Sequence, residues 1–365
     1  MTPAPAQSGY EDLLVAVFAA RDRGDLAECE RLVAAHPEHT AALRAALETM
    51  ARAGFLDDAA AASGFPPLLG EFRLLQPIGG GGMGIVFLAE QPSLRRKVAV
   101  KLVRPELMLS GVARERFQRE VETIAQLQHP GIVPVLAVGR HHGVPWFAME
   151  FVPGCSLAEV LLSVAGRSTD SLDGDDFARA VGAGTGGDAV WCADGWWRTC
   201  VGVVAAIAST TAFVHARGIL HRDLKPSNIM VTTEGHPLLL DFGLARVGAA
   251  ADTPRLTRSG VELGSLAYMS PEQLRGEAVD ERTDVYSLGV TLYELLALAL
   301  PFAAVGDAEL RLAIELGRHR PLRTQNRAVS PDLGLVVATA IDIDRERRYP
   351  SMAAMAADLR AVLEG

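Results

Sequence analysis

The sequence is short of cysteine, of positive charge and of long apolar runs, and each shortage excludes a class of protein. Its four cysteines, among 365 residues, are scattered without the spacing of a metal site. Reduced thiols in a cytosolic protein are therefore expected rather than a disulfide framework. The net charge of -9, with no long block of like charge, argues against a general nucleic-acid-binding protein.

Signals for secretion and membrane insertion are also missing. Residues 1–10 have no basic stretch followed by an apolar run, so no secretory signal is expected. The most apolar segments, residues 201–214 and 288–302, fall short of the roughly 20 residues needed to span a bilayer. Both are predicted to be buried helices, and the chain is predicted to be cytoplasmic with no membrane span.

The order of the expected elements predicts an α+β chain with two lobes. Residues 10–53 carry helical apolar stripes, and residues 54–68, with a Gly-Phe-Pro-Pro sequence, resemble a linker. After residue 155 the chain is mostly helical, which places strands before helices. The expected strands cover residues 72–77, 85–90, 97–103, 133–140 and 146–151, with one helix over residues 112–127.

From this order we predict an N-terminal helical accessory region and linker over residues 1–66 and a main domain over residues 70–363. Its small lobe, residues 70–150, is expected to be an antiparallel sheet with one helix, and its large lobe, residues 153–363, to be mainly α-helical. Residues 165–195, rich in Gly and Asp, are predicted to be an insertion, and a surface loop is favoured over a docking role. The N-terminal stripes could pack on the domain, on a partner or on each other, and we expect the last.

A glycine-rich segment, residues 79–86, has the spacing Gly-x-Gly-x-x-Gly-x-Val. On its own this spacing also occurs in dinucleotide-binding turns and in flexible hairpins. A dinucleotide-binding turn runs into a helix, whereas residues 85–88 continue as a strand, and no Gly-Lys-Ser/Thr follows that would indicate a P-loop. The segment is therefore predicted to be a strand–turn–strand flap. Its backbone N–H groups can lie over phosphates because glycine permits a close approach.

Lys101 ends the apolar strand sequence Val-Ala-Val-Lys a short way after this flap. A lysine at such a position is often only a surface residue with a buried stem. Here it lies where a cation would meet the phosphates of a nucleotide. Glu120, on the following helix, is a candidate partner for Lys101, and a solvated helical glutamate is the alternative.

The most informative stretch is residues 221–228, His-Arg-Asp-Leu-Lys-Pro-Ser-Asn, followed by Asp-Phe-Gly at residues 241–243. These two motifs supply two acids, a lysine and an amide, and the short apolar hairpin between the motifs would bring the groups close together. Phosphoryl transfer needs these groups: a base near the attacking hydroxyl, a cation near the moving phosphate and oxygen ligands for magnesium. An isolated Arg-Asp pair would be a common surface feature, but the full series is far more specific.

Together with Val-Ala-Val-Lys at residues 98–101 and Ser-Pro-Glu at residues 270–272, these motifs resemble the signature set of protein kinases. The chain is similar to bacterial Ser/Thr protein kinases from about residue 70 to residue 363. The resemblance implies a two-lobed α+β protein kinase fold. It also implies transfer of the γ-phosphate of ATP, with Mg2+ or Mn2+ as cofactor, to Ser or Thr hydroxyls of proteins.

The resemblance assigns roles to the matching positions of the catalytic motifs. Asp223 would accept the proton of the substrate hydroxyl or orient that hydroxyl. Lys225 would neutralise charge on the transferred phosphate. Asn228 and Asp241 would hold the metal ion. An ordinary aspartate is already ionised at neutral pH, which suits both tasks.

The same resemblance implies a nucleotide site around Lys101, which would bind the α- and β-phosphates and pair with Glu120. Met149 would lie at the back of the adenine site, and backbone groups of Glu150 and Val152 would meet the base edge. The remaining contacts would come from the flap and from apolar walls: Ile78, Gly79, Gly80, Gly81, Gly82, Met83, Gly84, Val86, Ala99 and Met230. Each apolar residue of this set is also a candidate for ordinary strand core.

Residues 264–272 resemble the segment on which peptide substrates dock. Ser265 stands where family members commonly have Thr, and it keeps a hydroxyl near the catalytic aspartate. Glu272 is expected to pair with Arg348. Asp284 is expected to brace the turn that carries the catalytic aspartate. Arg345 replaces a usual Pro, and only a local effect is expected from it.

The segment between residues 241 and 272 contains Thr253, Thr257 and Ser259, and Arg222 precedes the catalytic aspartate. An arginine at that position indicates control by phosphorylation, because a phosphate adds nearly two negative charges that Arg222 could bind. We therefore predict that Thr257 or Ser259 is autophosphorylated. Unmodified loop hydroxyls are expected for at least one of the three.

Three functions remain to be weighed. An active Ser/Thr protein kinase is favoured because every catalytic position is present. A nucleotide-binding pseudokinase scaffold would typically have lost Lys101, Asp223 or Asp241, and a small-molecule kinase would lack the Ser-Pro-Glu segment with its long preceding loop. Protein substrates and ATP are therefore the expected partners, with a regulatory partner for the N-terminal helices or residues 165–195 as a further interpretation.

Overall fold

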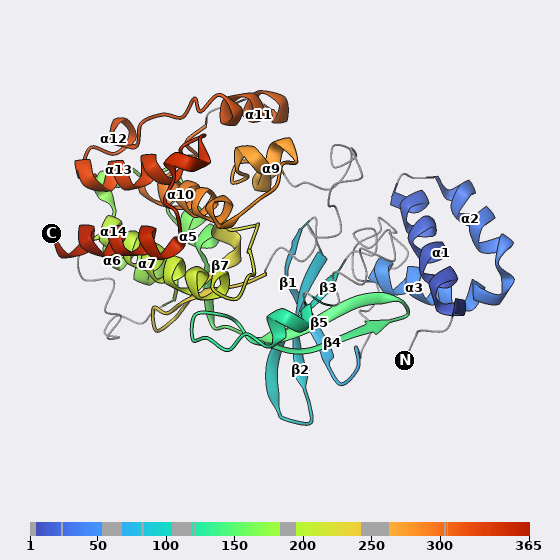
Figure 1. The fold of residues 1–365 in the computed structure, drawn as a ribbon. Coiled ribbons are helices and arrows are strands. Elements are labelled where there is room, and N and C mark those ends of the chain that lie inside the picture. The colour runs from blue at the N-terminus through green and yellow to red at the C-terminus, as the bar shows by residue number, and fades with distance from the viewer. Residues whose placement is uncertain are drawn as a thin grey trace. The chain divides into compact units, whose positions relative to one another are not determined.

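A computed structural model describes most of the chain as two compact units (Figure 1). The first unit comprises Met1–Gln126 and Pro134–Phe151, and the second comprises Leu127–Val133, Val152–Gly243 and Val261–Gly365. Each unit is considered by itself. The structure describes residues 5–22, 25–52, 68–81, 84–103, 119, 121–182, 195–241, 263–302, 304 and 306–365.

The first unit is built on a five-stranded antiparallel sheet with the strand order β1-β2-β3-β5-β4. The small antiparallel sheet expected from the sequence is therefore confirmed. Of the helix expected over residues 112–127, residues 121–125 are helical, and residues 104–118 lie outside the described part. The strands are β1 (Arg73–Gly81), β2 (Gly84–Gln91), β3 (Arg96–Val103), β4 (Val135–His141) and β5 (Val144–Glu150).

The two faces of this sheet carry different side chains. Residues directly opposite each other in neighbouring antiparallel strands project to the same face. Lys101 in β3 lies opposite Val86 in β2 and Phe147 in β5, and Ala99 lies opposite Met149. These five residues share one face, called the site face below. The opposite face, called the back face, carries the buried residues Phe87, Val98, Val100, Leu102, Trp146 and Ala148.

The N-terminal helices share a hydrophobic core with the back face. Leu14, Val17 and Phe18 of the first helix are at most 2% exposed, and they belong to the same buried cluster as Val100 and Leu102. The expectation that the N-terminal stripes pack only on each other is therefore wrong. The reason is that the back face is itself apolar and needs a cover. The helices are α1 (Pro5–Asp22), α2 (Leu26–Ala35) and α3 (Thr40–Arg52), with the 3-10 turn η1 (Pro37–His39) before α3.

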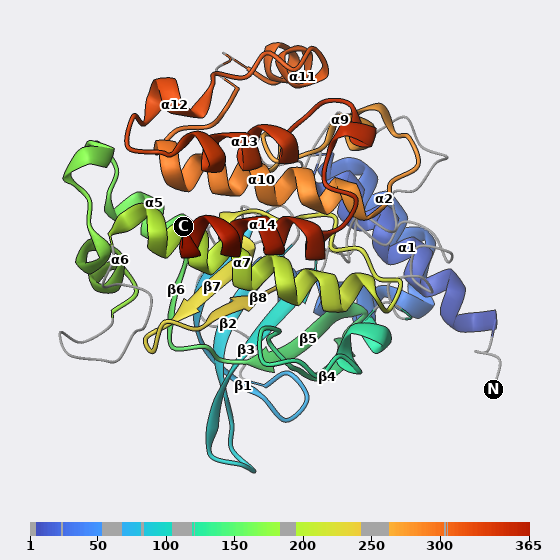
Figure 2. The ribbon, with the colours of Figure 1, turned by 60° about the vertical axis from the view of Figure 1, so that its left-hand side comes forward.

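The second unit is mainly helical, with a small antiparallel sheet of order β6-β7-β8. Helix α7 packs against α10 and α14, and α13 packs on α10 (Figure 2). The strands are β6 (Gly154–Ser156), β7 (Ile229–Thr232) and β8 (Pro237–Leu239), with the 3-10 turns η3 (Thr169–Ser171), η4 (Pro226–Asn228) and η6 (Arg345–Arg347). The helices are α5 (Leu157–Ser163), α6 (Gly174–Ala180), α7 (Trp196–His215), α8 (Leu263–Leu266), α9 (Pro271–Arg275), α10 (Glu281–Ala297), α11 (Asp307–Glu315), α12 (Leu322–Gln325), α13 (Pro331–Ala340) and α14 (Met352–Glu364).

Helix α7 confirms that residues 201–214 form a buried helix, and α10 confirms a buried helix for residues 288–297, whereas residues 298–302 lie beyond its end at Ala297. Among the residues that the structure describes, α7 alone is long and apolar enough to cross a membrane, and 67% of its apolar window is buried within the fold. It is longer than the apolar segment expected from the sequence because it begins at Trp196, whose indole N–H donates to the carbonyl of Leu295 at 2.8 Å. Burial of this kind is typical of a core helix.

Residues 165–182 contain regular secondary structure, whereas we expected a surface loop. They contain η3 and α6, and α6 begins with a capping box in which Asp173 and Asp176 exchange side-chain and backbone hydrogen bonds. Arg167 binds the buried carboxylate of Asp176 through both of its terminal nitrogens, at 2.6 and 3.0 Å. Residues 183–194 lie outside the described part, and the limits of the insertion stay a prediction.

Candidate active site

The loop that carries Asp223 is anchored by Asp284, a fully buried residue in the first turn of α10. Its carboxylate accepts hydrogen bonds from the backbone N–H groups of His221 and Arg222, both at 2.7 Å. His215, at the end of α7, is also 2.7 Å from this carboxylate. Burial raises the pKa of Asp284, but the nearby histidines and these hydrogen bonds outweigh it and hold the pKa below its usual range. The brace expected from the sequence is thus confirmed.

His221 connects the same loop to the end of β8. Its Nε2 is 2.9 Å from the carbonyl of Leu240, and its Nδ1 lies 3.3 Å from the backbone N–H of Asp223. An acceptor at Nδ1 and a donor at Nε2 describe the neutral imidazole. Burial lowers the pKa of His221 despite the surrounding carboxylates, which agrees with a neutral ring. The sequence offered no role for this residue, because only the fold brings Leu240 beside it.

Replacing Asp284 with Asn is expected to lower the free energy of unfolding of the second unit by about 2 kcal/mol, the scale of one charge-assisted hydrogen bond. An amide has only one oxygen for the two backbone N–H groups, so its NH2 group faces a donor. Urea unfolding monitored by circular dichroism measures the loss. The control, Asp332→Asn, changes an exposed aspartate of α13 and should unfold like the wild type. Equal stability of the two variants would contradict the anchoring role.

Asp223, Lys225 and Asn228 are brought together on this anchored loop. The ammonium group of Lys225 is 2.9 Å from Oδ2 of Asp223, and Nδ2 of Asn228 donates to the same oxygen at 3.0 Å. Asp223 is only 5% exposed, so these contacts are held in a largely desolvated place. Lys225 also donates to the hydroxyl of Ser265 at 2.7 Å. The loop and the segment that resembles a peptide-docking site are therefore directly connected.

Asn228 and Asp241 fit the oxygen chemistry of a divalent cation. Nδ2 of Asn228 is committed to the backbone and side chain of Asp223, which turns the amide oxygen to the other side. The carbonyl of Asn228 accepts from the backbone N–H of Leu240 at 2.9 Å, so Asp241 follows directly beside it. Magnesium is commonly bound by one or two such protein oxygens together with substrate phosphates. Both residues are thus suited to the predicted metal site.

On the site face of the first unit, Lys101 lies among residues predicted to contact the nucleotide. It is 9% exposed, and Val86, Ala99 and Met149 project to the same face from β2, β3 and β5. This register brings Lys101, which is predicted to bind phosphate, together with three residues of the predicted apolar wall. Glu150, whose backbone is predicted to meet the base edge, is exposed at the end of β5.

The flap begins as a pair of strands, as the sequence predicted. Gly79 lies in β1 opposite Val86, and Gly84 opens β2 with a φ of 155°. A Cβ atom at Gly84 would stand 2.1 Å from the carbonyl oxygen of Leu102, so no larger residue fits there. Ile78 is 44% exposed.

The other predicted contacts lie in three places. Gly80 and Gly81 are the last residues of β1, and Val152 and Met230 belong to the second unit. Gly82, Met83 and Glu120 lie outside the described residues.

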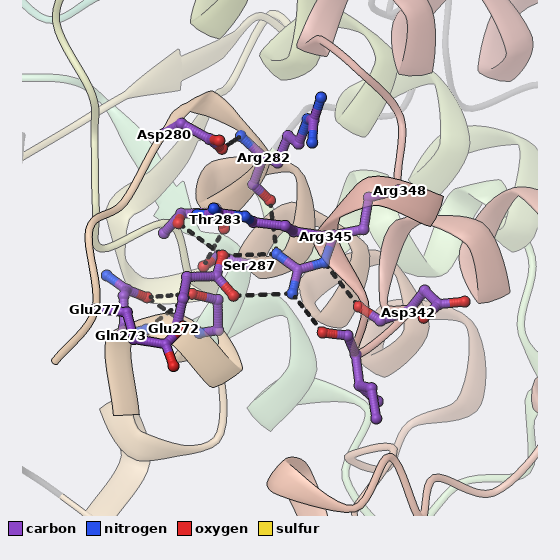
Figure 3. A network of polar contacts seen from close by, with 12 residues as sticks. Glu272, Gln273, Glu277, Asp280, Arg282, Thr283, Ser287, Asp342, Arg345 and Arg348 are labelled. Carbon is purple, nitrogen blue, oxygen red and sulfur yellow. Dashed lines mark hydrogen bonds and ion pairs between the residues drawn. The ribbon is translucent and has the colours of Figure 1, made fainter. Parts of the chain in front are cut away.

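The expected pair of Glu272 and Arg348 is present and buried (Figure 3). The two guanidinium nitrogens of Arg348 donate to the two carboxylate oxygens of Glu272 at 2.7 and 2.9 Å, and Thr283 adds a hydrogen bond at 2.8 Å. The unusual Arg345 donates to the carbonyl of Ala278 at 3.2 Å, a local contact as expected. This network holds the segment after Ser265 against the start of α10.

A cavity of about 720 Å³ lies beside the loop that carries Asp223, within the second unit. Pro226, Tyr268 and Glu294 are among the residues that line it. The hydroxyl of Tyr268 donates to Glu294, whose pKa is raised by burial. The rest of the lining comes from apolar residues of α5, from residues 165–169, and from Ala297, Leu298 and Gln325. The sequence predicted neither the cavity nor the Tyr268–Glu294 pair, since each depends on packing between distant segments.

The fold and these contacts define a protein kinase, and comparison with known proteins agrees. The model of the protein kinase domain family matches residues 72–358, so the chain belongs to the protein kinase family. The family and the fold class expected from the motifs are therefore confirmed.

Bacterial Ser/Thr kinases are among the chain's relatives. It is 35% identical over 306 residues to the serine/threonine-protein kinase PknB of Mycobacterium leprae, covering 82% of this chain and 44% of the relative. It is 33% identical over 309 residues to PknD of Chlamydia caviae, covering 80% and 31%. The chain thus spans less than half the length of these relatives. The crystal structure of the PknI kinase domain of Mycobacterium tuberculosis, as a C20A mutant, is similar in fold, with 24% identity, a TM-score of 0.59, and coverage of 82% of this chain and 98% of that domain.

Proposed function

We propose that this chain is a Ser/Thr protein kinase that transfers the γ-phosphate of ATP to proteins, with Mg2+ as the cofactor. The observation that carries the proposal is the group formed by Asp223, Lys225 and Asn228 and anchored on Asp284. Phosphoryl transfer depends mainly on positioning and on neutralising charge, and this group supplies both. The similarity to bacterial Ser/Thr kinases supports the same function.

In this proposal each residue acts on a particular atom. The carboxylate of Asp223 accepts the hydrogen bond of the acceptor hydroxyl and orients it. Lys225 places its positive charge near the transferred phosphate and, through Ser265, near the bound acceptor segment. Asn228 and Asp241 offer the oxygens that hold a divalent cation, which neutralises phosphate charge when bound. Lys101 would fix the α- and β-phosphates from the site face of the sheet.

A protein acceptor is favoured over a small molecule. The hydroxyl of Ser265 is joined to Lys225, so the peptide-docking segment and the catalytic group are one connected unit. The cavity beside Pro226 offers room for a side chain that flanks the acceptor residue. The lysine two residues after the catalytic aspartate favours Ser or Thr over Tyr as the acceptor residue. A cytoplasmic location, expected from the reduced cysteines, belongs to the same proposal.

A pseudokinase scaffold is the alternative function, and turnover separates the two. We expect the purified chain to label a generic basic protein from radiolabelled ATP in the presence of Mg2+, and to lose this activity when EDTA removes the metal. A chain that binds ATP but transfers no phosphate would favour the scaffold. Buffer containing heat-denatured chain provides the control for background labelling.

Autophosphorylation is expected at Thr257 or Ser259, which lie outside the described residues. A phosphate there adds nearly two negative charges near neutral pH and would bind Arg222, whose backbone is fixed by Asp284. Intact-mass analysis after incubation with Mg-ATP should show an added phosphate, and peptide mapping should place it at one of these residues. A Thr257→Ala, Ser259→Ala double variant should lose that mass increase. An unchanged increase in the double variant would contradict the assignment.

A further inference from the structure

The back face of the sheet is an apolar surface that has to be covered. Every residue of β3 from Val98 to Val103 is buried, although only alternate residues face the site. Val98, Val100 and Leu102 are each fully buried on the back face. Such a continuous buried run is typical of a strand covered on both sides. The cover includes α1, whose Leu14 and Phe18 belong to the same core.

Helix α1 makes direct contact with the turn between β4 and β5. The hydroxyl of Tyr10 donates to the carbonyl of His142 at 3.4 Å. Gly143 has a φ of 85°, and a Cβ atom placed on it would stand 2.5 Å from Cδ2 of Leu14. The glycine therefore leaves the space that Leu14 occupies. Tyr10 also stacks at a tilt on His39 of η1, with ring centroids 5.3 Å apart, so the contact involves the helical region as a unit.

The β4–β5 turn leads directly to the predicted nucleotide site. Strand β5 starts at Val144, next to the turn, and ends at Glu150. Between them, Phe147 pairs with Lys101 and Met149 pairs with Ala99. Displacement of the turn would therefore be transmitted along a hydrogen-bonded strand to the lysine and to the adenine wall. The helices lie before residue 72, where the match to the protein kinase family begins, so this contact is an addition to the family's domain.

We propose that residues 5–52 form a built-in docking module that controls the nucleotide-binding sheet. Seated on the β4–β5 turn, α1 holds β5 and the back face in the arrangement that places Lys101 and Met149. Release of α1 loosens β5 and weakens nucleotide binding. Cys29 of α2 and Leu43 and Ala46 of α3 are buried in the same core, so all three helices take part in covering the back face. The effect on nucleotide rests on the proposed kinase function, whereas the docking does not.

The test uses the full chain with Leu14→Asp, which places a charge where Leu14 is only 2% exposed. We expect hydrogen exchange of peptides covering residues 141–149 to become at least about tenfold faster. We also expect a fluorescent ATP analogue to bind about 5- to 10-fold more weakly, within the usual range of coupling between sites. Leu26→Asp, at a position of α2 that is 57% exposed, is the matched control and should behave like the wild type.

A second variant, Leu14→Ala, keeps the test decisive if the aspartate prevents folding. It removes the contact with Gly143 without adding charge, and it should change exchange in the same direction to a smaller extent. The proposal is overturned if exchange over residues 141–149 stays at the wild-type rate, or if it rises while nucleotide affinity does not fall. A wild-type chain that binds no nucleotide would refute the kinase function and the control of binding, while the exchange rates would still decide whether α1 is docked.

Discussion

Asp223→Asn is expected to reduce phosphate transfer by about 10²- to 10⁴-fold, the range that a positioned acid–base group contributes. Asparagine keeps the shape of the side chain but removes the negative charge that Lys225 and Asn228 contact at 2.9 and 3.0 Å. The acceptor hydroxyl then has no carboxylate to orient it. Nucleotide affinity should change little, because the predicted phosphate and adenine contacts lie elsewhere. The measurement is the rate of labelling of a generic basic protein, together with binding of a fluorescent ATP analogue.

A matched control for this variant is Asp175→Asn, an exposed aspartate in the first turn of α6. It removes the same charge from the same unit and should retain the wild-type rate. If Asp223→Asn and the wild type label equally, the activity belongs to a contaminant or Asp223 is not the catalytic residue. A loss of activity accompanied by a loss of folding would show up in circular dichroism, and would argue for a structural role instead.

Arg348→Met is expected to destabilise the second unit by about 3–5 kcal/mol, which is the usual cost of leaving one partner of a buried ion pair alone. The melting temperature should fall by roughly 10 °C for a unit of this size. Arg348 is 4% exposed and Glu272 3%, so solvent cannot replace the lost partner. The guanidinium also donates to the carbonyls of Asp342 at 2.7 Å and Arg282 at 3.1 Å, which would lose their donors (Figure 3).

Two comparisons separate the ion pair from a general effect of losing an arginine. Arg347→Met removes the neighbouring arginine, whose side chain is 75% exposed, and should be nearly neutral. The double variant Glu272→Leu, Arg348→Met removes both charges and should lose less stability than the sum of the single variants. Additive losses would show that the two side chains do not interact energetically.

The same ion pair predicts how stability depends on pH. Burial raises the pKa of Glu272, but the hydrogen bonds and charge of Arg348 outweigh it and hold the pKa at about 2. A carboxyl group whose pKa is lower in the folded state contributes stability above its unfolded pKa, near 4.5. That contribution is lost as the pH falls from about 4.5 towards 2. In Glu272→Gln this part of the acid-induced loss should be absent.

Much of the fold and of the candidate site could be predicted from the sequence because their signals are local. A strand is indicated by a few consecutive residues that are all apolar or that alternate between apolar and polar. Asp223, Lys225 and Asn228 lie within six positions of one another, and this spacing already places their side chains close together. The pairing of Glu272 with Arg348 is different, since 76 positions separate them. It was reached only through the resemblance to a family and not through any property of the two segments.

The sequence alone determined which chemical groups are present, and two short motifs supply them. It also determined which segments become strands and helices, because these features depend on neighbouring residues. Tertiary structure decided which apolar faces meet. It seated α1 on the β4–β5 turn, brought His215 and the backbone of His221 onto Asp284, and formed the cavity beside Pro226. The hydrophobic effect is non-directional and does not specify which two apolar faces pack together. The shape and packing of segments far apart in the chain therefore determine the partner of each face.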